Sequence, residues 1–131
     1  MHFVPLILSI AAGVVTLAVG IYMAQPWGDN YAYQSLGDYV VLLIMLSWAT
    51  APYLYIFHHA RRASLPEAAA ISNIVAALVV CVGGIYLMVD AGFINIDAQG
   101  GLILIVLPFY QWLFIGACRC LARFWRARRA P

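Results

Sequence analysis

Four long apolar runs constrain this chain more than any other feature of its sequence. A helix needs about 20 mainly apolar residues to cross the hydrocarbon core of a bilayer, at a rise of about 1.5 Å per residue. Helices are the expected form because backbone groups in lipid must be hydrogen-bonded within their own segment, and the short alternating segments of barrel strands are missing. The sequence therefore predicts an all-α integral membrane protein, a bundle of four transmembrane helices at residues 4–24, 39–57, 68–89 and 102–122.

The composition excludes an ordinary soluble domain. The chain has 131 residues, of which 66% are hydrophobic and only 9% are charged. A soluble domain carries about 25% charged residues, and so few charges cannot cover a surface that faces water. We therefore expect one membrane domain over residues 1–131, which ends in a basic cytoplasmic tail at 123–131.

Charged residues divide between the two ends of the predicted helices. All seven basic residues are arginines, and they fall in the connection 58–67 or close to the carboxyl terminus. The connections 25–38 and 90–101 hold four of the five acidic residues and no base. Because arginine and lysine gather on the cytoplasmic side, the pattern predicts a multi-pass protein with both termini in the cytoplasm. We assign it to the inner (plasma) membrane of a bacterium.

The second pair of helices is similar to the first pair. Residues 20–22 (GIY) align with residues 84–86 (GIY), and Trp48 aligns with Trp112 at the same offset. Apolar helices also match by chance, which is the alternative reading. A duplicated two-helix unit predicts two helical hairpins related by an axis along the membrane normal. Such a parallel repeat differs from the inverted repeat that is common in alternating-access transporters.

Small residues form a stripe at helical spacing on the first and third predicted helices. The members are Ser9, Gly13, Thr16 and Gly20 on the first helix, and Asn73, Ala77, Cys81 and Gly84 on the third. Small side chains let backbones approach closely where lipid removes the hydrophobic drive for association. We expect these two helices to pack at the centre of the bundle, with the bulkier second and fourth helices beside them. The alternative is that one stripe faces another subunit.

Two prolines, Pro52 and Pro108, fall inside the second and fourth predicted helices. A proline leaves a carbonyl without its helical donor and bends the helix. Ser47, Thr50 and Gln111 are near enough in sequence to bond the freed backbone groups. We interpret both prolines as packing kinks, and a gating hinge is the alternative.

The predicted spans contain few polar side chains. No Asp, Glu, Lys or Arg lies near the middle of any span, whereas proton-coupled transporters usually keep such a costly residue there. Asn73 and Gln111 remain, and interhelical hydrogen bonds in membranes average well below about 2 kcal/mol. We interpret both as helix-packing residues, with contact to a pore or substrate as the alternative.

Several possible metal ligands fall near the predicted cytoplasmic face: His2, His58, His59, Cys118 and Cys120. Imidazole and thiolate bind zinc and copper. However, the spacing matches no closed zinc site, and successive helical residues point about 100° apart, so adjacent histidines cannot readily serve one ion. A haem would need histidines that face each other inside the membrane. We therefore expect no metal and no cofactor.

Arginines are predicted to anchor the cytoplasmic face to lipid or to a partner, and the candidates are Arg61, Arg62, Arg119, Arg123 and Arg126. A basic segment beside a membrane lies on anionic headgroups, and each basic residue contributes about 1 kcal/mol near the surface. Simple anchoring is the first interpretation, and docking of an acidic partner is the alternative. We expect no nucleic-acid binding from so short a tail.

The sequence favours a protein that works by contact rather than by chemistry. It would be an accessory subunit of a larger membrane complex or an immunity-type protein that neutralises a membrane-active toxin. Its partners would be lipids and another membrane protein or a second copy. The alternative is an oligomeric channel or carrier for a small solute, lined by polar side chains of several subunits. We expect no enzyme, because no serine–histidine or carboxylate pair falls at one membrane level.

Overall fold

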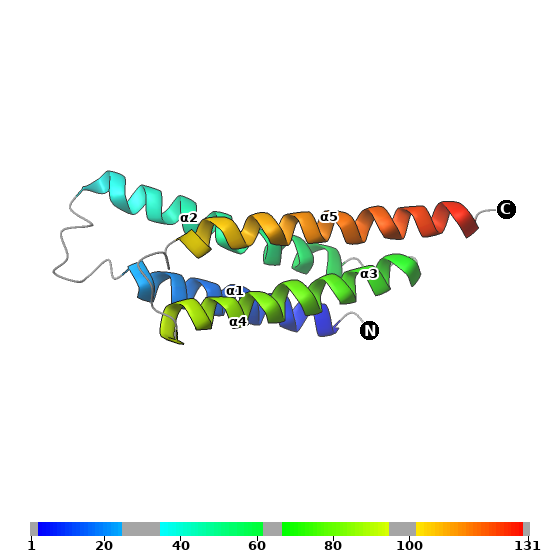
Figure 1. Ribbon diagram of the computed structural model, residues 1–131, viewed down its shortest axis with the longest axis horizontal. Helices are drawn as coiled ribbons and strands as arrows, with labels where there is room; N and C mark the ends of the chain where they lie inside the picture. Colours follow the sequence, from blue (N-terminus) through cyan, green and yellow to red (C-terminus); the bar gives the residue numbers. More distant parts are fainter. Residues whose placement is uncertain (1–2, 25–34, 62–66, 95–101, 130–131) are drawn as a thin grey trace.

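The computed structural model describes residues 3–24, 35–61, 67–94 and 102–129, and the regular structure in these ranges is helical. Four helical rods lie lengthwise in one bundle (Figure 1). Three rods are single helices: α1 (Phe3–Ala24), α2 (Leu36–Ala60) and α5 (Ile103–Arg129). The third rod, residues 67–94, joins α3 (Glu67–Ala77), the π-helical segment η1 (Leu78–Val82), α4 (Gly83–Val89) and the π-helical segment η2 (Asp90–Ile94).

Each rod contains a stretch that is long and apolar enough to cross a membrane. These stretches are Phe3–Ala24, Leu36–Ala60, Ala70–Val89 and Ile103–Trp125. The prediction of an all-helical chain with four candidate membrane helices is therefore confirmed.

Two helices extend beyond their predicted bounds for local reasons. α2 begins at Leu36 rather than at residue 39 because Ser35 and Asp38 form a capping box. The Asp38 N–H donates to Ser35 Oγ at 3.3 Å, and the Ser35 N–H donates to the Asp38 carboxylate at 2.8 Å. α5 continues past residue 122 to Arg129 through arginine and alanine, which are good helix formers. The Arg128 guanidinium lies 4.3 Å from the Phe124 ring centroid one turn earlier.

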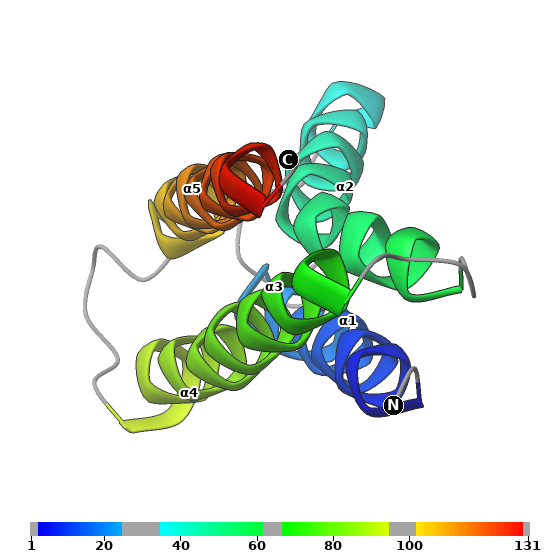
Figure 2. The ribbon, with the colours of Figure 1, turned by 90° about the vertical axis from the view of Figure 1, so that its right-hand side faces the viewer.

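The rods form a four-cornered bundle. α1 packs against α2 and the third rod, and α5 packs against the same two, so that α1 and α5 lie at opposite corners (Figure 2). α2 also contacts the third rod. Two clusters of buried apolar side chains fill the interior, one around Tyr53, Ile56 and Ile115 and the other around Val19, Met88 and Leu104.

The predicted packing of the first helix against the third is present, because α1 contacts all four segments of the third rod. These two rods do not form a separate centre, however, because the two glycines make room for side chains of α2 and α5. A Cβ added at Gly20 would lie 2.6 Å from Leu46 Cδ2 on α2, and one at Gly84 would meet Tyr53 and Gln111. Large side chains of α2 and α5 therefore fill the space that the stripes leave, and all four rods share the core.

Both prolines lie inside continuous helices and are buried. The Thr50 hydroxyl donates to the carbonyls of Leu46 at 2.9 Å and Ser47 at 3.2 Å. The carbonyl that Pro52 leaves without its helical donor is that of Trp48, so these bonds differ from the predicted one. The sequence predicted that Gln111 bonds the backbone of its own helix near Pro108, and the structure shows different partners. Its amide bonds groups on two other rods instead.

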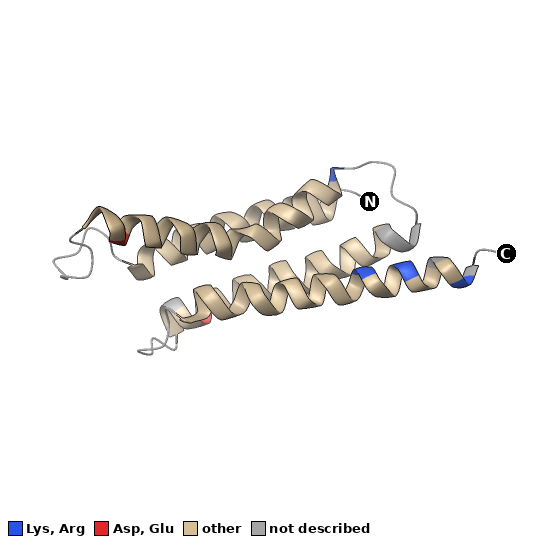
Figure 3. Ribbon diagram, turned by 90° about the horizontal axis from the view of Figure 1, so that it is seen from above, with Lys and Arg blue, Asp and Glu red and all other residues tan. Residues whose placement is uncertain are grey.

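The described arginines and acids lie at opposite ends of the bundle (Figure 3). We call these the arginine end and the acidic end. The arginine end holds the last residues of α2 and α5, and the acidic end holds Asp38 at the start of α2 and Asp90 near the end of the third rod.

Candidate functional site

A group of polar side chains lies buried in the middle of the bundle, and we call it the central polar cluster. It consists of Thr16, Tyr53, Gln111 and the main-chain carbonyl of Val80, so every rod contributes. Gln111 Nε2 donates to the Tyr53 hydroxyl at 2.9 Å and to the Val80 carbonyl at 3.3 Å. These bonds join α5 to both α2 and the third rod inside the bundle.

The cluster fits only because Gly84 has no side chain. A Cβ at Gly84 would lie 2.6 Å from Gln111 Nε2 and closer still to the Tyr53 hydroxyl, which is nearer than real Cβ atoms approach. Tyr53 is 2% exposed and Gln111 is 5% exposed, so both side chains are buried where they meet Gly84. The predicted packing role of Gly84 therefore takes a specific form, which is to accommodate a hydrogen bond between α2 and α5.

The cluster offers hydrogen bonding rather than acid–base chemistry. Thr16 lies near the Tyr53 hydroxyl, but Thr16 Oγ1 and Gln111 Oε1 have no hydrogen-bond partner among the residues that the structure describes. The groups present are two hydroxyls, an amide and a carbonyl. The π-helical segment η1 contains Val80, and such segments often bring a carbonyl out of the regular ladder.

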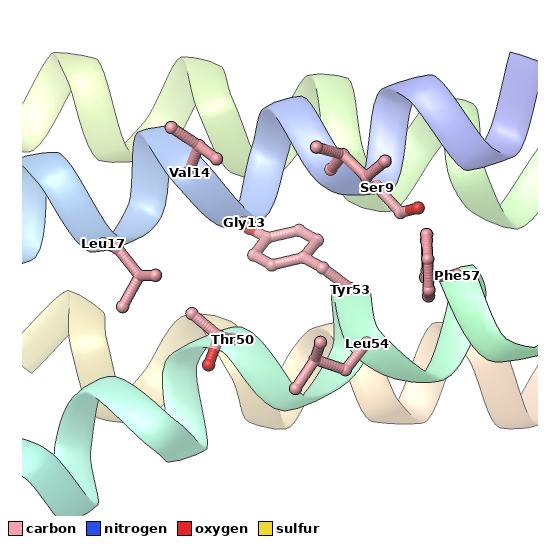
Figure 4. Close-up of a pocket in the computed structure, with 9 residues that line it drawn as sticks. Ser9, Gly13, Val14, Leu17, Thr50, Tyr53, Leu54 and Phe57 are labelled. Carbon is pink, nitrogen blue, oxygen red and sulfur yellow. The ribbon is translucent and has the colours of Figure 1, made fainter.

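A cavity of about 300 Å³ lies between α1 and α2, and we call it the α1–α2 groove (Figure 4). Ile10, Gly13, Val14 and Leu17 line it from α1. Leu54 and Phe57 line it from α2, together with the ring of Tyr53 opposite Gly13. A Cβ added at Gly13 would meet nothing within 4 Å, so this predicted packing glycine opens onto the groove rather than onto another rod.

At the arginine end, several guanidinium groups lie over aromatic rings. The Arg61 guanidinium carbon is 5.4 Å from the Phe57 ring centroid, and that of Arg119 is 5.1 Å from the Tyr55 ring centroid. Arg119 also donates a hydrogen bond to the Tyr55 hydroxyl and so ties α5 to α2. Arg123 is exposed, whereas Arg62 and the side chain of Arg126 lie outside the described residues.

The outward face of α5 is covered by no other rod. Phe109 is 57% exposed, Tyr110 is 64% exposed and Leu113 is 57% exposed. Gly116, Ala117 and Cys120 are also exposed, and they form a low-relief patch on the same face, because their spacing keeps them within the same half of the helix. A Cβ at Gly116 would meet nothing within 4 Å.

The metal-ligand candidates do not come together. His58 and His59 are neighbours on α2 with ring centroids 5.7 Å apart, and His59 Nδ1 lies 3.1 Å from the Tyr55 carbonyl of its own helix. Cys118 is half-buried, and its carbonyl accepts a hydrogen bond from Ser72 Oγ, whereas Cys120 is exposed. In the part of the chain that the structure describes, no three His, Cys, Asp or Glu side chains gather. His2 lies outside that part.

The remaining predicted polar residues stay local. Ser9 is buried, and its hydroxyl donates to the Leu6 carbonyl of the same helix at 2.9 Å. Asn73 is half-buried, and its Nδ2 has no hydrogen-bond partner within the described ranges. Neither residue joins the central polar cluster.

Sequence reasoning singled out Gln111 but missed its partner Tyr53 and the exposed Tyr110. Aromatic residues in membrane helices usually sit at the interfaces. A tyrosine well inside a span is therefore a usable signal, and both tyrosines carry it.

Comparison with known proteins finds no protein family, no curated protein and no solved structure that matches this chain.

Proposed function

We propose that this protein works in the inner membrane of a bacterium by binding another transmembrane protein along the outward face of α5. It acts as an accessory subunit of a membrane complex or as an immunity-type protein, and it catalyses no reaction. The observation that carries the proposal is the uncovered low-relief patch of Gly116, Ala117 and Cys120, below the exposed rings of Phe109 and Tyr110.

The chemistry of this face suits a helix better than lipid alone. In a bilayer, helices associate through close van der Waals packing, and small residues permit that approach. The open space beyond Gly116 lets a neighbouring backbone come near. Tyr110 lies seven residues into the span that begins at Ile103, about 10 Å along the axis, so its hydroxyl is available for a bond to the partner.

Filling the patch tests the proposal. Gly116→Leu projects a large side chain into the proposed interface. Gly83→Leu is the matched control, because a Cβ at Gly83 on α4 also meets nothing within 4 Å. We expect a photo-crosslinker at Ala117 to capture a second protein, and Gly116→Leu to reduce that product at least tenfold while Gly83→Leu leaves it unchanged. Tyr110→Phe should weaken the contact by only about threefold, the average value of one interhelical hydrogen bond.

The outcomes separate the possible partners. A product of twice the mass of the chain would identify a second copy, and a different mass would identify another protein for sequencing. Equal crosslinking in Gly116→Leu and Gly83→Leu, or no protein product from Ala117, would contradict the proposal.

The alternative of an oligomeric channel or carrier receives less support from the packing. Polar side chains that line a path between subunits must face outward, yet Gln111 is 5% exposed and Thr16 is 1% exposed within a single chain. Solute flux in proteoliposomes that disappears on Gln111→Leu would favour this alternative.

We also infer that both termini face the cytoplasm and that the chain arose from a duplicated hairpin. The separation of arginines from acids supports the orientation. The contacts of Gly20 and Gly84, which occupy equivalent positions of the proposed repeat and which both face α2 and α5, are consistent with the duplication.

A further inference from the structure

The α1–α2 groove runs along the bundle axis from the middle of the bundle toward the arginine end (Figure 4). Its lining on α1, from Ser9 to Leu17, extends to both sides of the middle of that helix, and its lining on α2, from Thr50 to Phe57, lies in the half nearer Arg61. Eight residues at about 1.5 Å each give about 12 Å, which is most of one half of a hydrocarbon core of about 30 Å. The groove therefore has the length of an acyl chain site in one leaflet, and its α2 side places it toward the arginines.

The polar groups along the groove are bonded within the protein. The Ser9 hydroxyl donates to the Leu6 carbonyl, the Thr50 hydroxyl donates to its own helix, and the Tyr53 hydroxyl accepts from Gln111. The groove thus offers apolar surface without a spare hydrogen-bonding group from these three residues. A hydrocarbon occupant matches such a lining, whereas a polar solute would leave its own groups unbonded.

The groove is long enough for a lipid chain. Its cavity of about 300 Å³ extends over about 12 Å of α1, between Ser9 and Leu17. A single acyl chain, which carries no side groups, can lie along this length beside Gly13.

A positively charged side chain, Arg61, lies at one end of the groove. Phe57 lines the groove on the side of the arginine end, and the Arg61 guanidinium lies over the Phe57 ring at 5.4 Å, one turn further along α2. A chain that lay in the groove would bring its polar head to this guanidinium. Arginine binds phosphate oxygens through several N–H groups at once.

We propose that the α1–α2 groove binds one anionic phospholipid of the leaflet at the arginine end, with an acyl chain beside Gly13 and the phosphate on Arg61. The site is separate from the outward face of α5, so its test does not depend on the proposed partner. One basic residue near the surface corresponds to about a fivefold preference for an anionic over a zwitterionic headgroup.

Two pairs of variants test the two halves of the site. Gly13→Leu fills the groove, and Gly83→Leu is its control at an open glycine of another rod. Arg61→Gln removes the cation over Phe57, and Arg128→Gln removes a cation over Phe124 on α5. The four variants and the unchanged chain are reconstituted with equimolar phosphatidylglycerol and phosphatidylcholine of identical chains, and retained lipid is counted by native mass spectrometry.

We expect the unchanged chain, Gly83→Leu and Arg128→Gln to retain one phosphatidylglycerol about fivefold more often than phosphatidylcholine. Gly13→Leu should lose the retained lipid of both kinds. Arg61→Gln should bind both lipids equally, because the acyl chain site remains. Retention by Gly13→Leu, an undiminished preference in Arg61→Gln, or a photo-crosslink from position 13 to a polypeptide would overturn the proposal.

Discussion

At the scale of single residues, the packing at the centre of the bundle depends on the glycine at one particular position of α4. Gly83 and Gly84 are adjacent in α4, yet their surroundings are opposite. A Cβ at Gly83 meets open space, whereas one at Gly84 would collide with Tyr53 and Gln111. Gly84 therefore leaves the room in which these two side chains form their hydrogen bond.

The two glycines supply a prediction with an internal control. Gly84→Ala should lower the free energy of unfolding by about 1–3 kcal/mol, because an added methyl group forces buried side chains off their positions. Gly83→Ala should cause no loss, since alanine has the higher helix propensity and the space is free. Equilibrium unfolding in mixed micelles measures both. A Gly84→Ala protein as stable as Gly83→Ala would show that the Tyr53–Gln111 pair does not fix the packing.

At the scale of elements, the ends and irregularities of the helices come from polar details rather than from hydropathy. α2 begins earlier than its apolar run because Ser35 and Asp38 satisfy each other's backbone N–H groups. The third rod keeps its direction through two π-helical segments, and one of them presents the Val80 carbonyl to Gln111. Hydropathy carries no information on these features.

The cap of α2 can be tested alone. Ser35→Ala removes the side-chain acceptor of the capping box, which is worth about 1 kcal/mol at a helix start. Backbone amides at Gly37 and Asp38 should then exchange with solvent deuterium about fivefold faster, while those beyond Leu42 keep their rates. Ser47 is an exposed residue in the middle of the same helix, and Ser47→Ala should leave the exchange of all these amides unchanged. Equal exchange in both variants would contradict the importance of the cap.

At the scale of the whole molecule, charge and packing act on different axes. The described arginines separate from Asp38 and Asp90 along the bundle axis, as Figure 3 shows, and this supports the proposed orientation in the membrane. Around the bundle axis the outer surface is apolar, and Leu43 and Ile44 on α2 are each 63% exposed. The inner and outer faces of a helix are therefore both apolar, and they differ in burial rather than in hydropathy.

The orientation can be measured in intact cells. We expect a single cysteine introduced between residues 62 and 66, in a chain without its native cysteines, to resist a membrane-impermeant maleimide until the membrane is opened. A cysteine introduced between residues 25 and 34 should react at once, because the proposed topology puts that connection outside the cell. Immediate reaction of the 62–66 cysteine would reverse the proposed topology.

The number and approximate position of the helices could be predicted from the four apolar runs, because such runs can satisfy their backbone in lipid only as helices. The order of the connections also predicted that the arginines lie at the end of the bundle opposite Asp38 and Asp90. Which faces of the helices meet could not be predicted, because in lipid no hydrophobic drive turns one apolar face inward rather than another. The side chains that Gly20 and Gly84 accommodate, the Tyr53–Gln111 bond and the groove beside Gly13 all depend on how the four rods fit together, and no spacing in the chain specifies that fit.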